Sequence, residues 1–148
     1  EVKIDAAIDY KTANLEEVIP ELCPEGIDVI FDNVGGEFLN TALLSINQNA
    51  RVAICGAISG YNNETPAPGP SNYTALLIQR ARMEGFIVLD YMDRFPEAIG
   101  ELMQWVQEGK IIYQEDIQEG IENAPDTLLR LYTGQNKGKQ LLKIADPE

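Results

Sequence analysis

Residues 26–58 read GIDVIFDNVGGEFLNTALLSINQNARVAICGAI, and this stretch decides the fold. Its two ends, residues 26–33 and 50–58, are short apolar runs rich in β-branched residues, which is typical of strands buried on both faces of a parallel sheet. Apolar residues between them recur at the spacing of about three helical turns: Phe38, Leu39, Ala42, Leu43 and Ile46. Because strand–helix–strand connections are right-handed and join parallel strands, the stretch predicts an α/β fold.

The same alternation continues on both sides of this stretch. Upstream we expect a short strand over residues 6–10 and a short helix over residues 15–22 that ends near Pro24. Downstream we expect a loop over residues 59–70, a helix over 73–82, a strand over 84–90, and a helix over 95–106 closed by Gly109 and Lys110. A loop as long as 59–70 is uncommon inside a compact domain and is often functional.

The pattern changes after Lys110. Residues 111–113 and 118–121 are typical of short edge strands, residues 125–132 of a helix, and residues 140–144 of a final strand. This tail does not extend the alternation, so we expect it to dock onto another part of the protein. The predicted organisation is an α/β domain over residues 1–110 and a returning tail over residues 111–148.

The composition argues against several classes of partner. Asp and Glu number 24 and Lys and Arg 11, a net charge of −13, so nucleic acid and anionic membranes are poor partners. No apolar run approaches the roughly 20 residues that span a bilayer, and no signal peptide opens the chain. Two widely spaced cysteines, Cys23 and Cys55, form no disulfide framework and fit a reducing cytoplasm. The chain begins at Glu1 in the middle of a pattern, so we expect a fragment of a longer cytoplasmic protein.

The sequence contains no histidine and no closely spaced pair of cysteines. An ordinary zinc site cannot be built from such a chain, and we expect it to bind no metal. Catalysis by Ser-His-Asp or Cys-His groups is also excluded within this chain. Most hydrolase mechanisms are therefore removed.

Candidate binding residues follow the expected strands. Polar or glycine-containing segments stand at residues 9–11, 33–36 and 55–59. Ligands of doubly wound sheets bind beyond the carboxyl ends of the strands, where glycines let the backbone approach a flat ligand, although the same glycines also suit tight turns. No Gly-x-Gly-x-x-Gly motif opens a helix after a strand, so the chain holds at most half of a dinucleotide crevice.

Five segments together resemble one family. They are residues 7–11 (AIDYK), 27–36 (IDVIFDNVGG), 55–62 (CGAISGYN), 82–86 (RMEGF) and 134–139 (GQNKGK). Their order and spacing resemble the zinc-independent medium-chain reductases. This family includes the prostaglandin reductases (leukotriene B4 12-hydroxydehydrogenases), bacterial NADPH-dependent curcumin reductases and plant alkenal double-bond reductases. The resemblance runs from about residue 6 to residue 144.

This resemblance implies a partial Rossmann-like, doubly wound parallel sheet with a C-terminal return segment. It implies hydride transfer from NADPH to the carbon–carbon double bond of an α,β-unsaturated aldehyde or ketone. The Gly-rich phosphate loop and the substrate domain would lie upstream of Glu1, and the tail would return to that domain. We therefore expect the isolated chain to be inactive.

The resemblance also assigns NADP(H) contacts to matching positions. These are Tyr10, Asn33, Cys55, Gly56, Ala57, Ile58, Ser59, Tyr61, Phe86, Ile87, Val88 and Asn136. Tyr10 would lie near the adenosine ribose phosphate, the run from Cys55 to Tyr61 beside the nicotinamide half, and Asn136 would approach from the tail. Simpler interpretations stand beside these roles: Phe86 to Val88 would be buried in any such strand, Cys55 would be a small apolar residue, and Asn136 would shape a turn.

Tyr61 is the candidate catalytic residue. An enone that accepts hydride develops enolate charge on its oxygen, and a hydroxyl donor stabilises that charge. A tyrosine resting on the surface of a loop is the simpler interpretation. Mammalian members of the family carry a tyrosine where this chain has Ile78, and Tyr73 is a weaker substitute. Water or cofactor hydroxyls are alternative proton donors.

Two other functions remain open at this point. An NADPH quinone reductase of the same superfamily would share the fold, and a non-catalytic nucleotide-binding module would bind the cofactor without turnover. The expected partners are a small electrophile and a second copy of the chain. That copy would pair along the sheet edge at residues 84–90, because exposed sheet edges favour pairing.

Overall fold

The computed structural model of the chain describes residues 4–146, which form two compact units. One unit comprises residues 4–93 and the other residues 94–146. The division falls between Asp93 and Arg94, whereas the sequence pattern placed it after Lys110. The assignment of the two parts to a cofactor domain and a returning tail stays a prediction.

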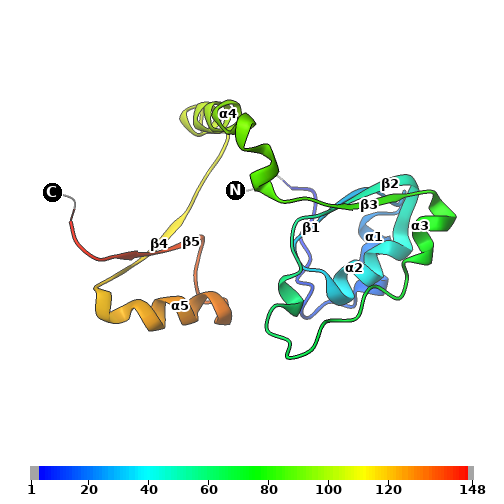
Figure 1. Cartoon of the computed structure of the whole chain (residues 1–148), viewed down its shortest axis with the longest axis horizontal. Coiled ribbons are helices and arrows are strands. Elements are labelled where there is room, and N and C mark those ends of the chain that lie inside the picture. Colours follow the sequence, from blue (N-terminus) through cyan, green and yellow to red (C-terminus); the bar gives the residue numbers. More distant parts are fainter. Residues whose placement is uncertain (1–3, 147–148) are drawn as a thin grey trace. The chain divides into compact units, whose positions relative to one another are not determined.

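A parallel three-stranded sheet forms the first unit. Its strands are β1 (Ile27–Asp32), β2 (Ile46–Ile54) and β3 (Arg82–Gly85), in the spatial order β1-β2-β3. The helices α1 (Leu15–Leu22), α2 (Gly36–Ala42) and α3 (Thr74–Gln79) lie on one side of this sheet (Figure 1). Strand β2 pairs with both neighbours, which confirms the predicted strand–helix–strand unit and the α/β fold class.

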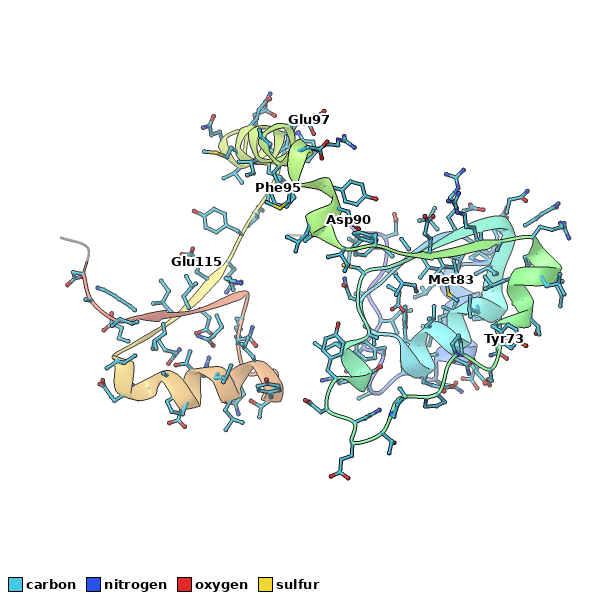
Figure 2. All side chains as sticks on the ribbon, in the orientation of Figure 1. Tyr73, Met83, Asp90, Phe95, Glu97 and Glu115 are labelled. Carbon is cyan, nitrogen blue, oxygen red and sulfur yellow. The ribbon has the colours of Figure 1, made fainter. Side chains whose placement is uncertain are left out.

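The core lies between the sheet and these helices. Its buried apolar residues are Leu15, Ile19, Ile30, Leu39, Ala42, Leu43, Ile46, Ala50 and Val52. Met83 of β3 packs against this core (Figure 2). Along β1, Ile30 and Asp32 point toward the helices, whereas Val29 and Phe31 on the opposite face are 68% and 60% exposed. The prediction that β1 is buried on both faces is therefore wrong for this unit, because all three of its helices lie on the same side.

The first expected strand, residues 6–10, is not a strand in the structure. A strand needs a hydrogen-bonded neighbour. In the classic doubly wound order 3-2-1-4-5-6, the third strand pairs with the second, whereas the fourth, fifth and sixth are neighbours. Strands β1, β2 and β3 fit the fourth, fifth and sixth positions of this order, so residues 6–10 would fit the third position. Their partner would be the strand at the second position, which the described residues do not contain.

Strand β2 starts earlier and ends earlier than the pattern predicts. The expected helix ran through Ile46, but α2 ends at Ala42, a single 3-10 turn covers Leu43–Ser45, and Ile46 pairs with Ile27. The pairing then shifts, and Asn49 within this irregular stretch has φ +64°. An apolar residue at helical spacing serves equally well as the first buried residue of a strand, which explains the difference.

Strand β3 is shorter than the predicted strand over residues 84–90. The Phe86 N–H still donates to the Ile54 carbonyl oxygen at 3.2 Å, and β2 ends at that residue. Beyond it β3 has no partner, and the chain turns into 3-10 turns over Val88–Arg94 that include Asp90 (Figure 2). The apolar run after Gly85 is therefore not a strand.

The second unit contains its own small strand–helix–strand motif. Strands β4 (Glu115–Glu119) and β5 (Lys139–Lys143) pair in parallel, and α5 (Ala124–Thr133) connects them. Residues 111–113 form no strand, and β4 begins before the predicted residue 118. Helix α4 (Phe95–Gln107) also belongs to this unit and has no buried residue. None of the helices within residues 4–146 is long and apolar enough to cross a membrane.

Candidate functional site

The carboxyl ends of β1, β2 and β3 lie at one edge of the parallel sheet. The segments that follow these ends are residues 33–36, residues 55–61 and residues 86–88, which hold most of the predicted cofactor contacts. Sheet topology therefore brings the three segments to the edge at which doubly wound proteins bind ligands. Tyr10 also lies near this edge, as its shared cavity with Gly35 shows.

Asp32 organises the first of these segments, and the sequence analysis missed it. The residue is 1% exposed. Its carboxylate accepts hydrogen bonds from the Val34 N–H at 2.9 Å and from the Gly35 N–H at 3.0 and 3.1 Å. Because a buried carboxylate is costly without such partners, these bonds fix the turn after β1. The sequence signal was an acidic residue at the end of an apolar strand, directly before a glycine pair.

The segments after β1 and β2 are hydrogen-bonded to each other. The Asn33 carbonyl oxygen accepts from the Ile58 N–H at 3.1 Å. The Val34 carbonyl oxygen accepts from the Ser59 N–H at 3.1 Å and from the Ser59 hydroxyl at 2.6 Å. The two segments therefore form one continuous surface. Because these hydrogen bonds join them, a displacement of one segment would disturb the other.

Glycines permit this close approach. Gly35 has φ +67° and ψ −153°, a conformation that is essentially restricted to glycine. A Cβ atom on Gly56 would lie 3.1 Å from the Tyr61 hydroxyl and 3.3 Å from the Asn33 carbonyl oxygen. The glycines predicted as ligand contacts thus also have a structural role, in bringing the two segments together.

The side chain of Tyr61 folds back onto its own segment, residues 55–61. Its hydroxyl oxygen accepts a hydrogen bond from the Ala57 N–H at 3.3 Å, and the side chain is 68% exposed. A tyrosine hydroxyl is both an acceptor and a donor. Since the acceptor function is used by Ala57, the O–H group is available to donate to an oxygen of a bound molecule. This geometry suits the predicted role in stabilising an enolate.

A cavity of about 400 Å³ opens beside these segments. Tyr10, Gly35, Phe38 and Ser59 are among its lining residues, and the rings of Tyr10 and Phe38 are 6.2 Å apart in an edge-on arrangement. The other lining residues are Ala13, Asn14, Leu15, Glu16, Val34, Glu37 and Thr41. The lining thus contains two carboxylates and no Lys or Arg.

The third segment combines one packed residue with two exposed ones. The Phe86 ring lies 5.8 Å from that of Phe31 and 6.1 Å from that of Tyr91. Ile87 and Val88 are exposed. The simpler interpretation of these two residues as buried strand positions is therefore wrong for this unit, and both are open to a ligand.

Asn136 lies in the second unit, where its amide donates to the Gly138 carbonyl oxygen at 2.8 Å. The turn that carries it is tied to β4 through Asp116. The Lys137 N–H donates to the Asp116 carboxylate at 3.0 Å, and Arg130 pairs with the same carboxylate at 2.7 Å. These donors lower the pKa of Asp116 from 3.8 to about 2. Asn136 therefore shapes an ordered turn, and its contact with a cofactor stays a prediction.

The weaker tyrosine candidate lies elsewhere. Tyr73 stands at the start of α3 (Figure 2), and its neighbour Asn72 is bonded to Asn40 of α2. Ile78 on the same helix is exposed. Neither residue is bonded to the segment that carries Tyr61.

The donor set does not fit a zinc ion. The sequence has no histidine, and residues 4–146 contain no group of three or more Cys, Asp or Glu side chains placed to hold a metal. Cys55 is exposed, and its N–H donates to the Asp32 carbonyl oxygen at 2.8 Å. The expectation that this chain binds no metal stays a prediction.

The fold and the arranged strand ends define the C-terminal part of a Rossmann-like dehydrogenase or reductase domain. Residues 1–108 match the family model described as zinc-binding dehydrogenase. The chain belongs to this family. The sequence of this chain has no histidine that could serve as a zinc ligand.

Comparison with related proteins shows which members of the family this chain resembles. YfmJ of Bacillus subtilis, whose name describes an NADP-dependent oxidoreductase, is 47% identical over 99% of this chain and 44% of its own length. Prostaglandin reductase 1 of Bos taurus is 44% identical over 94% of this chain and 43% of its own. The NADPH-dependent curcumin reductase of Escherichia coli is 38% identical over 95% and 42%. The resemblance to prostaglandin and curcumin reductases is confirmed, and the chain spans less than half the length of these relatives.

A solved structure supports the same placement. CurA from Vibrio vulnificus in complex with NADPH superimposes with a TM-score of 0.84 at 37% identity, over 97% of this chain and 44% of that chain. The predicted Rossmann-like fold is thereby confirmed.

Proposed function

We propose that this chain is the NADP(H)-binding part of an oxidoreductase that reduces the carbon–carbon double bond of α,β-unsaturated aldehydes and ketones. The observation that carries the proposal is the paired surface of residues 33–36 and 55–61 at the carboxyl edge of the sheet, with the Tyr61 hydroxyl free to donate. Relatives named as prostaglandin and curcumin reductases support the substrate class.

Each part of this surface has a role in the proposed reaction. NADPH, when bound, supplies the hydride. Asn33 is exposed at the strand end, where its amide is positioned to bond ribose hydroxyls, and Gly56 and Ala57 present backbone to a flat ring. Tyr61 donates a hydrogen bond to the carbonyl oxygen of the substrate, on which negative charge develops as the β-carbon is reduced.

The chain fits only part of the cofactor. The cavity beside Tyr10 carries Glu16 and Glu37, which repel a 2′-phosphate, and the chain has no Gly-rich loop that would bind a pyrophosphate. Selectivity for NADPH must therefore depend on cations outside the cavity lining. Consequently we expect the 148-residue chain alone to bind the cofactor weakly and to be inactive.

Quinone reduction is the alternative within the same superfamily. A solved structure from Bacillus thuringiensis, of a protein named as an NADPH:quinone reductase, shares the fold at 16% identity, with a TM-score of 0.71. The low identity shows the fold alone, whereas the relatives above 35% identity favour the enone class. A non-catalytic nucleotide-binding module is the remaining alternative.

We also propose a homodimer that pairs along the outer edge of β3. Strand β3 pairs with β2 on one side only, and its Arg82 and Glu84 side chains are exposed. An unpaired strand edge offers backbone donors and acceptors to a second copy. The structure limits the strand part of this edge to Arg82–Gly85 instead of the predicted residues 84–90.

The test is NADPH oxidation by the protein at its full encoded length. Its absorbance decay is recorded with an α,β-unsaturated ketone, with a quinone and without an electrophile, and the 148-residue chain is assayed in parallel. Rapid decay with the enone supports the proposal. Turnover of the quinone alone would move the assignment to a quinone reductase, and binding without turnover of either would leave a nucleotide-binding module.

A further inference from the structure

We propose that Asp32 is a positioning residue for the cofactor-binding surface, acting through the turn after β1 and the segment after β2. Asp32 is 1% exposed, so it would act through these two segments and not by direct contact with a ligand. The inference rests on the proposed NADP(H) site. One buried carboxylate would keep the two segments of that site in a fixed arrangement.

The Asp32 side chain is buried and fully engaged with backbone N–H groups. The carboxylate is on the helix-covered face of β1, away from solvent, and its acceptor positions receive the backbone N–H groups of Val34 and Gly35. A carboxylate accepts at both oxygens, whereas an amide places an NH₂ donor at one of them. Substitution by Asn would therefore set that donor against a backbone N–H group in a buried position. Asp32 thus suits the turn because both of its side-chain oxygens accept hydrogen bonds, which Asn cannot reproduce.

The backbone that this carboxylate bonds has an unusual conformation. Gly35 adopts a φ/ψ combination that glycine accepts and other residues avoid. Because glycine has many other accessible conformations, the turn depends on hydrogen bonds to keep this one. The main chain of Asp32 contributes as well, because its carbonyl oxygen accepts from the Cys55 N–H at 2.8 Å and from the Gly56 N–H at 3.1 Å. One residue therefore fixes the turn after β1 through its side chain and the start of the next segment through its main chain.

Hydrogen bonds connect this turn to the segment after β2. Val34 donates its N–H to the carboxylate, and Asn33 lies between Val34 and Asp32 in the chain. The carbonyl oxygens of Asn33 and Val34 accept from Ile58 and Ser59. Loss of the carboxylate would release these carbonyl oxygens and with them the segment that carries Tyr61. A displacement of about 1 Å at such a site is enough to weaken binding and catalysis strongly. Asp32 thereby controls the geometry of both halves of the surface.

The test compares Asp32→Asn with the matched control Asp28→Asn. Asp28 is on the same strand, is exposed, and accepts from the Asn47 amide at 2.9 Å, a bond that an Asn side chain can still accept. Both variants lose one negative charge, so a difference between them reports the buried position. In the 148-residue chain, amide hydrogen exchange is measured by NMR. We expect Asp32→Asn to accelerate exchange at Gly35, Ile58 and Ser59 by about tenfold or more, and Asp28→Asn to leave it unchanged.

The second measurement separates positioning from general stability. In the protein at its full encoded length, Asp32→Asn should raise the KM for NADPH by about tenfold, with a much smaller change in kcat at saturating NADPH. If Asp32→Asn does not fold, Ser59→Ala removes the hydroxyl bond to Val34. Because Ser59 is itself a predicted cofactor contact, this variant is measured by exchange alone: it should accelerate exchange of the Ile58 amide by about threefold, and Ser59→Thr should restore it.

The outcomes are distinct. An unchanged KM and unchanged exchange in Asp32→Asn would overturn the inference. If the parent protein shows no NADPH binding, the proposed function fails instead, and the exchange of Ile58 and Ser59 still decides whether Asp32 orders the two segments.

Discussion

The guanidinium of Arg130 lies 2.7 Å from the carboxylate of Asp116, and this ion pair ties α5 to β4. Arg130 also donates from Nε to the Gln140 side-chain oxygen at 3.0 Å, and Gln140 in turn donates to the Asp116 carbonyl oxygen at 2.7 Å. Helix α5 and strands β4 and β5 thus meet at one partly buried network. Because it contains the Asp116 carboxylate, this network is expected to respond to pH.

Acid should loosen the second unit in a defined pH range. The Lys137 N–H, and after it the Arg130 side chain, lower the pKa of Asp116 to about 2, below the ordinary 3.8. A depressed carboxylate pKa stabilises the folded state above the ordinary value, and this stabilisation is lost as the pH falls through the folded value. We therefore expect the second unit of the wild-type chain to unfold at lower urea concentrations as the pH falls from about 4 to about 2. The NMR signals of the β4 and β5 amides measure this unfolding. Asp116→Asn should be less stable at pH 6 and show less of this pH dependence. An equally steep loss in the variant would contradict the assignment to Asp116.

Gly35→Ala should destabilise the first unit. The positive φ of Gly35 and its ψ of −153° are unfavourable for alanine, at a cost of about 1–3 kcal/mol in the free energy of unfolding. Its added Cβ would also lie 3.3 Å from the Ala57 Cβ. Urea unfolding followed by circular dichroism measures the change. The NMR signal of the Val52 amide, followed in the same titration, shows that the transition belongs to residues 4–93.

Gly100→Ala is the matched control. This glycine is inside α4, and an added Cβ would meet nothing within 4 Å. Alanine favours helix over glycine by about 1 kcal/mol, so this variant should be as stable as the wild type or more stable. Equal destabilisation by both substitutions would show that the conformation of Gly35 is not the cause.

Leu43 and Leu44 offer a second matched pair. Leu43 is 0% exposed in the core, whereas Leu44 is 59% exposed. Leu43→Ala should lower the free energy of unfolding of the first unit by about 2–5 kcal/mol, because it leaves a cavity. Leu44→Ala should change it by no more than about 0.5 kcal/mol. Thermal unfolding of both variants measures the difference, and similar losses would mean that the core is not centred on Leu43.

Tyr61→Phe tests the proposed catalytic hydroxyl. In the protein at its full encoded length, loss of this donor should lower kcat for an α,β-unsaturated ketone by about 10²-fold, with little change in the KM for NADPH. Tyr73→Phe, at the start of α3, should leave both constants near the wild-type values. If Tyr61→Phe retains full activity, water or cofactor hydroxyls supply the proton instead.

Part of the site could be predicted from the sequence, and part could not. The strand ends at Asn33 and Cys55 were visible as apolar runs that stop at polar or glycine residues, and sheet geometry places such ends together. Asp32 was not visible as a functional residue, because an acidic residue at the end of a strand usually points to solvent. Only its position on the helix-covered face of β1 gives it the backbone N–H groups of Val34 and Gly35 as partners.

The sequence by itself determined the α/β class, the parallel pairing of β1 with β2, the helix Leu15–Leu22 and the family, because periodicity and motif spacing are local properties of the chain. The tertiary structure decided which apolar segments became strands. Residues 6–10 and the run after Gly85 have strand composition, yet residues 4–146 offer neither of them a strand to pair with. Ile46 became the start of β2 because Ile27 lies opposite it. A strand exists only where a second backbone supplies its hydrogen bonds, and that partner is distant in sequence.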